Sequence, residues 1–291
     1  MKKTLALVLM MTLLFSLAAC SSGSGSKSSE QGSKETVVSE QSKEDDKTEA
    51  VDGATSEDST TSPEEIAEFK DFIKDYVDLT HYEVGSPLLP NVFISLKDDY
   101  KPDYQTKKDV SLVNDIKVVY EDDIEIKKGT KYQEFLDKGW EPKGYLDYAS
   151  LEKNYIYSDI GLYKNDKHLQ ISLMTEKKEK TPIKDCVVAS LTEFSCEYNV
   201  HDLFLDFSKQ DPSSPDYMIN GKISKTSGLK DIISVFGEPS SVTKSTQKNG
   251  SESLLLIRYD DTNNGELEFS VSPDGKVIGR FTINWYVQFK R

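Results

Sequence analysis

The chain has 291 residues and a net charge of −14 at pH 7. Residues 63–291 carry 30 basic and 40 acidic side chains, a net charge of about −10. Such an acidic body argues against nucleic acid as a partner, because a phosphate backbone would be repelled. Solubility alone also explains the acidity. This body is long enough to build one or two hydrophobic cores.

Residues 1–19 are typical of a signal peptide. Two lysines follow Met1, and the stretch from Thr4 to Ala19 carries no charge. This stretch is shorter than the about 20 residues that a membrane-spanning helix needs. A basic start, an apolar middle and small residues at the end therefore indicate a cleaved secretory signal.

The signal ends in Leu17-Ala18-Ala19-Cys20, which resembles the site at which bacterial lipoprotein precursors are cut. The resemblance implies that the Cys20 thiol receives a diacylglycerol and that Cys20 begins the mature chain. Two acyl chains, palmitate among them, would anchor the protein stably to the outer face of the cell membrane. The alternative is an ordinary signal peptide with a chance cysteine.

Residues 20–62 predict a disordered tether. This Ser/Gly-rich segment holds four lysines and ten acidic residues and almost no large apolar side chain. It cannot bury enough apolar surface to offset the entropy of ordering. A flexible chain of this length spans about 35 Å, which is enough to hold a folded body away from a membrane.

The folded body is expected to begin with a helix over residues 62–77. Ser62 and Glu65 match a capping box, and Pro63 suits the first turn. Apolar residues then recur at helical spacing. We assign residues 63–105 to this N-terminal helix and a connector.

Two later segments share one pattern at an offset of 97 residues. The stretch 124–142 aligns with 221–239, so that Phe135 matches Ile232 and Glu141-Pro142 matches Glu238-Pro239. Each stretch predicts a short helix that ends near a glycine and a proline. Alternating apolar residues follow both helices and predict a hairpin and a third strand in each copy. We place a first module at 106–200 and a second at 201–291, although chance similarity is the alternative.

The second copy resembles the small helix-plus-sheet modules of the β-lactamase inhibitor protein and of the SmpA/OmlA lipoproteins, on "SGLKDIISVFGEPSSV" and "LLLIRYDDTNNGELEFSVSPDGKV". The first copy, with "KYQEFLDKGWEP" and "TPIKDCVV", resembles extracytoplasmic lipoproteins of unknown function from Gram-positive bacteria. Together these features predict an α+β fold, in which an N-terminal helix precedes two tandem modules, each a helix with an antiparallel sheet. The resemblance implies a binding or assembly role.

Motifs for chemistry are missing from the sequence. The three histidines lack zinc-ligand spacing, and each is expected at the surface or at a rim. No Gly-x-Ser-x-Gly, P-loop or Gly-x-Gly-x-x-Gly is present. We therefore expect no catalytic residue, no metal and no cofactor. Cys186 and Cys196 could form a disulfide in an extracytoplasmic protein, or they could remain two thiols in or near a sheet.

Strand alternation suggests a surface for a protein partner. In the second copy, Leu267, Phe269 and Val271 should face the helix, which leaves Glu266 and Glu268 on the opposite face. The same argument places three further side chains on that face: Arg258, Arg280 and Tyr286. Either the face docks a partner or it is a solvated sheet surface with cross-strand ion pairs. If it does not bind, the tyrosine-rich insert from Tyr145 to Tyr157 is the next candidate.

Two functions remain open. The first is a non-enzymatic binding or assembly module, anchored outside the cell membrane through Cys20. The second is an extracytoplasmic hydrolase acting on cell-wall or surface material, which a pocket with converging carboxylates would favour.

Overall fold

The computed structural model describes residues 61–286, with gaps at 86–90, 107–111, 121–123, 145, 147–148, 154, 200–203, 247–252 and 261–264. Cys20, the signal peptide and nearly all of the tether lie outside the described residues. So do Tyr145 and Tyr148 of the tyrosine-rich insert.

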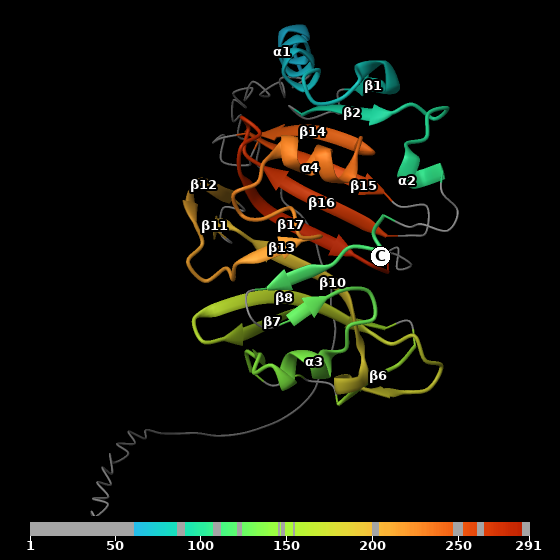
Figure 1. Cartoon of the computed structure of the whole chain (residues 1–291), viewed down its shortest axis with the longest axis vertical. Helices are drawn as coiled ribbons and strands as arrows, with labels where there is room; N and C mark the ends of the chain where they lie inside the picture. The colour runs from blue at the N-terminus through green and yellow to red at the C-terminus, as the bar shows by residue number, and fades with distance from the viewer. Residues whose placement is uncertain are drawn as a thin grey trace, which may run out of the picture. The chain divides into compact units, whose positions relative to one another are not determined.

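Ten strands form one antiparallel sheet (Figure 1). Its strands in spatial order are β1 (Tyr82–Gly85), β2 (Val92–Leu96), β14 (Ser241–Thr246), β15 (Ser253–Asp260), β16 (Glu266–Val271), β17 (Ile278–Asn284), β10 (Val187–Phe194), β8 (Lys167–Met174), β7 (Ile156–Lys164) and β5 (Glu141–Pro142).

The remaining described strands form three smaller sheets. The first contains β13 (Tyr217–Ile219), β3 (Val118–Tyr120) and β4 (Ile124–Ile126). The other two are the pair of β11 (Cys196–Asn199) with β12 (Phe204–Gln210) and the pair of β6 (Ser150–Leu151) with β9 (Thr181–Pro182).

The α-helices are short and locally encoded. They are α1 (Pro63–Ile73), α2 (Asp103–Thr106), α3 (Tyr132–Asp137) and α4 (Leu229–Phe236), with 3₁₀ turns at Leu79–His81 and Ile183–Asp185. The capping box predicted for α1 is confirmed, because Ser62 and Glu65 bond to each other's backbone N–H groups. α1 ends at Ile73, four residues earlier than predicted. Gly237 caps α4 at a φ of 79°, a left-handed conformation that glycine adopts at little cost.

The predicted fold class is wrong. The described residues are 45% strand and 18% helix, so the protein is mostly β rather than an α+β chain of helix-led modules. The modules do not form separate sheets, because strands from different predicted segments pair with each other. β10, in the first predicted module, pairs with β17 of the second, and β2, in the predicted connector, pairs with β14. Both pairings remove open sheet edges, which would otherwise expose unpaired backbone groups.

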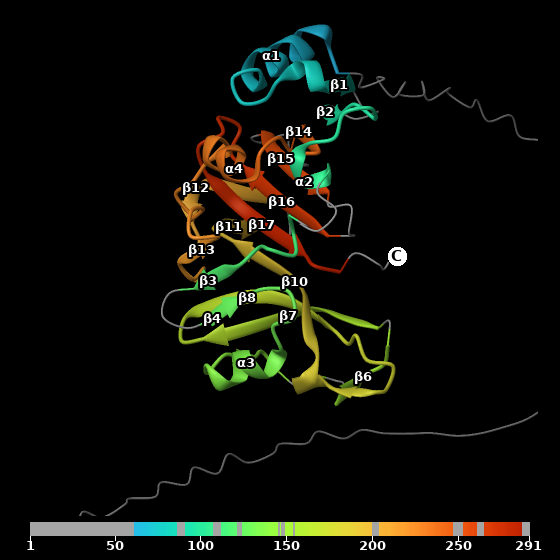
Figure 2. The ribbon, with the colours of Figure 1, turned by 45° about the vertical axis from the view of Figure 1, so that its right-hand side comes forward.

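The strand order is symmetric about the β10–β17 pair. Outward from this pair it reads β10, β8, β7 and β5 on one side and β17, β16, β15 and β14 on the other. α3 and α4 each precede one of these sets in the chain. Phe135 and Ile232, which align at the offset of 97, are both fully buried in one continuous core. β1 and β2 extend the second set alone (Figure 2).

The core lies on the face of the sheet that α4 covers. Leu229, Ile232 and Phe236 of α4 are buried. The Phe236 ring lies 5.6 Å from that of Tyr259 and 6.0 Å from that of Phe269. Leu267, Phe269 and Val271 are fully buried, as the alternation of β16 predicts. The opposite side chains of β15, β16 and β17 therefore form a second face, called the outer face below.

Candidate functional site

The outer face carries a group of paired charges on β15, β16 and β17. Strand register sets Arg258 opposite Glu268 and Asp260 opposite Glu266. The Arg258 guanidinium lies 2.8 Å from Glu266 Oε2 and 3.2 Å from Asp260 Oδ1. Arg280 donates a hydrogen bond to Glu268 from the neighbouring strand. Two of the predicted binding residues therefore lie on the same face, and each pairs with a different carboxylate of β16.

Burial differs between these two arginines. The Arg258 side chain is 44% exposed, while that of Arg280 is 31% exposed and its Nε is buried without a hydrogen-bond partner. Beyond Arg280, the Thr192 and Thr282 hydroxyls lie 3.2 Å apart and continue the polar face onto β10. Arg258 is therefore the more accessible of the two cations, and Arg280 also reaches the surface.

Tyr286 is not part of this group. β17 ends at Asn284, so the alternation that placed Tyr286 on the outer face stops two residues too early. Its ring instead receives Lys128 Nζ at 4.8 Å from the centroid and packs against the core. Burial and a hydrogen bond to Glu176 raise the pKa of its hydroxyl. The structure thus assigns Tyr286 a packing role.

Cys186 and Cys196 are free and buried. The eight residues of β10 lie between them. At a rise of about 3.3 Å per residue, this strand separates their Cα atoms far beyond the roughly 7 Å that a disulfide can bridge. Of the two alternatives, the structure has the thiols and not the disulfide. Burial raises the pKa of both thiols, that of Cys196 to about 11, so neither is an activated nucleophile.

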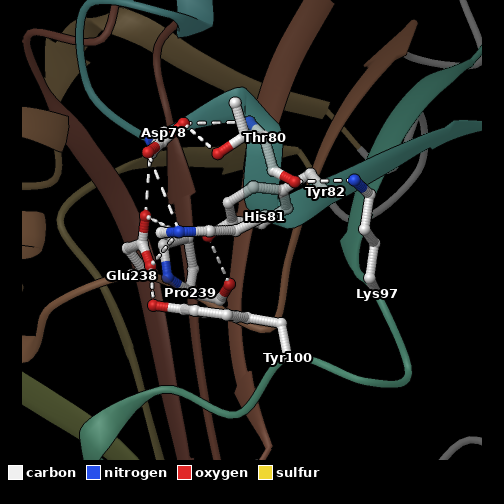
Figure 3. A network of polar contacts seen from close by, with 8 residues as sticks. All are labelled: Asp78, Thr80, His81, Tyr82, Lys97, Tyr100, Glu238 and Pro239. Carbon is white, nitrogen blue, oxygen red and sulfur yellow. Dashed lines mark hydrogen bonds and ion pairs between the residues drawn. The ribbon is translucent and has the colours of Figure 1, made fainter.

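A polar network that no sequence motif predicts surrounds Glu238 (Figure 3). His81 Nδ1 lies 3.0 Å from both carboxylate oxygens of Glu238. The Tyr100 hydroxyl donates to Oε2 at 2.7 Å, and the Asp78 N–H donates to Oε1 at 3.3 Å. Tyr82 donates to the next residue, at the Pro239 carbonyl. The network ties the segment before α2 to the end of α4. His81 lies at the rim, 31% exposed, and also takes part in this network.

The ring of Tyr100 is fixed in place by this network. It stacks on His81 with ring centroids 3.9 Å apart and an interplanar angle of 10° (Figure 3). The hydrogen bond to Glu238 raises the pKa of Tyr100 to about 12, so its hydroxyl remains a donor at physiological pH. Tyr100 and Glu238 also line a pocket of about 520 Å³ together with Asp103, Asp115 and Phe236.

A second missed feature is the buried carboxyl of Glu193. It lies on the core side of β10, where it accepts hydrogen bonds from Ser214 at 2.6 Å and from Tyr120 at 3.4 Å. Burial raises its pKa to about 8, against the opposing effects of Ser214 and Lys225. The signal was present in the alternation of "CVVASLTEF", in which Glu193 shares a face with Leu191.

Comparison with known proteins gives no counterpart. No family model, no curated protein and no solved structure matches the chain. Within the described residues, no cluster of three or more His, Cys, Asp or Glu is placed to hold a metal ion. The described helices are also too short or too polar to cross a bilayer.

Proposed function

We propose that the protein is a lipid-anchored, extracytoplasmic binding or assembly module without enzymatic activity. Cys20 holds it at the outer face of a bacterial cell membrane, and a protein partner docks on the outer face of the sheet. Neither nucleic acid nor a cofactor has a part in this function.

The observation that carries the proposal is the group of ion pairs on the outer face, in which Arg258 pairs with Glu266 and Arg280 pairs with Glu268. Antiparallel strands hold these side chains in fixed register. Charges held in fixed positions favour partners with complementary potential and disfavour others. Arginine is also over-represented at protein interfaces, where its planar fork pairs with carboxylates.

Crosslinking in intact cells tests this proposal. Wild-type protein and the double variant Arg258→Gln/Arg280→Gln would be crosslinked, purified and compared by mass spectrometry. The variant keeps a polar side chain at each position, although a shorter one, and removes both positive charges. We expect an unchanged circular dichroism spectrum and loss of the protein captured by the wild type.

The matched control is Lys230→Gln. Lys230 is an exposed cation on α4, on the core side of the sheet. The Lys230→Gln substitution removes a positive charge without altering the outer face, so this variant should capture the same protein as the wild type. Full capture by the folded double variant would contradict docking on the outer face.

A hydrolase is the second candidate, and the pocket beside Tyr100 is the observation in its favour. Asp103, Asp115 and Glu238 all line it. Both oxygens of Glu238 already accept hydrogen bonds, however, and the other two side chains are exposed. A catalytic acid usually depends on desolvation to keep its proton at neutral pH. Release of soluble fragments from purified cell walls by the protein, and its loss in Asp103→Asn, would favour the hydrolase.

A further inference from the structure

The pocket beside Tyr100 has walls of two kinds. Tyr100, Tyr104 and Phe236 supply aromatic surface, and Asp103, Asp115 and Glu238 supply carboxylates. At about 520 Å³ the pocket is within the size range of small-molecule sites. It lies where α2 and the end of α4 come together, and it is separate from the outer face.

The charged side chains among the described residues that line this pocket are all acidic. None of the described residues that line it is lysine or arginine. The last residues of α4, Val235 and Phe236, contribute the C-terminal end of a helix, where the carbonyl groups carry partial negative charge. Carboxylates and a helix C-terminus thus both favour a cation at this position.

The aromatic wall favours a cation as well. The face of a tyrosine ring attracts an ammonium group through the ring quadrupole. Tyr100 is held in one orientation by its stack on His81 and by its hydrogen bond to Glu238 (Figure 3). A ligand therefore pays little entropy to order this wall, which is the condition for useful affinity at a small site.

We propose that the pocket binds a primary ammonium group at the end of a short aliphatic chain. A lysine side chain of a peptide and a free diamine share this chemistry. In either case the ammonium lies among the carboxylates, and the methylene groups pack on Tyr100, Tyr104 and Phe236. The proposal does not depend on a partner at the outer face.

Equilibrium dialysis of the detergent-solubilised full chain tests it, with radiolabelled cadaverine as the probe. We expect saturable binding with a Kd of about 1 mM or below, since a ligand this small has few atoms to contribute. Nα-acetyl-lysine amide as competitor identifies peptide-borne lysine as a ligand. Nα-acetyl-norleucine amide has a similar apolar chain without the charge and should not compete.

Single variants locate the site. Asp103→Asn and Asp115→Asn each remove one charge from an exposed wall, and each should weaken cadaverine binding about threefold to fivefold. Tyr100→Leu removes the aromatic face and should weaken binding by a similar factor. Asp99→Asn is the matched control, since Asp99 is an exposed carboxylate in the same connector that does not line the pocket.

Each result decides the proposal. Binding that is weakened by Asp103→Asn and by Asp115→Asn but unchanged in Asp99→Asn supports it. Cadaverine competition by the lysine derivative assigns peptide lysine as a ligand, and absence of that competition assigns free diamines. Equal competition by the norleucine derivative, equal loss in all three Asp variants, or no saturable binding by the folded wild type would overturn it.

Discussion

At the residue scale, burial determines how Glu193 responds to pH. Its carboxyl is 1% exposed and its pKa is raised to about 8, mainly by desolvation. In the unfolded chain the group titrates near its ordinary value of 4.5. Between these two values the folded protein holds a proton that the unfolded chain has lost. The free energy of unfolding therefore falls as pH rises through this window.

Glu193→Gln should remove this dependence. An amide cannot titrate but keeps the size and an acceptor for Ser214. Relative to the variant, the wild type should lose about 1 kcal/mol of unfolding free energy per pH unit between about pH 5 and pH 8. Urea unfolding across this range measures the difference. Glu197→Gln, at an exposed carboxyl on β11, is the control, and a pH-independent difference for Glu193→Gln would contradict the assignment.

At the element scale, the Glu238 network connects the β1–β2 hairpin to the rest of the sheet. Asp78, His81 and Tyr100, which flank the hairpin, all bond to one carboxylate that follows α4. Glu141 holds the aligned place in the first repeat, and it is exposed. The two glutamates thus hold equivalent positions in the two repeats, but only Glu238 accepts hydrogen bonds from the segments that flank the hairpin.

Glu238→Ala should loosen the hairpin. Losing its hydrogen bonds would lower the local opening free energy by roughly 1–3 kcal/mol, because three donors lose their acceptor. Amide hydrogen exchange should accelerate about tenfold or more around residues 78–100 and stay unchanged in β16 and β17. Glu141→Ala should leave exchange at the hairpin as in the wild type. Equal effects of the two substitutions would show that Glu238 does not hold the hairpin.

These elements also show what the sequence could and could not predict. The start of α1 and the glycine end of α4 depend on residues within one helical turn. The alternation of β16 depends on residues of that strand alone. The local sequence therefore predicts all three features. The sequence does not predict which strands pair with each other, because the sequence of an edge strand does not specify its neighbour. Arg258 and Arg280 were found by alternation, whereas the partners of Glu238 lie 138 to 160 residues away in the chain.

At the scale of the whole molecule, the lipid anchor remains a prediction. Cys20→Ala removes the thiol that would carry the acyl groups. We expect the variant to appear as an uncleaved precursor or in the medium, while the wild type partitions into detergent with the membranes. Fractionation and the mass of the N-terminal peptide measure this. Membrane retention of Cys20→Ala with no acyl mass on the wild-type peptide would disprove lipidation.

The β10–β17 pair has one more consequence. The two symmetric halves of the sheet share backbone hydrogen bonds from Ser190–Asn284 to Phe194–Arg280. A hinge between the halves would have to break this ladder, and each freed backbone group would lose its partner. The two halves of the sheet therefore move as one rigid unit. A ligand that contacts both halves binds a preorganised surface. Heating should unfold both halves in a single cooperative transition.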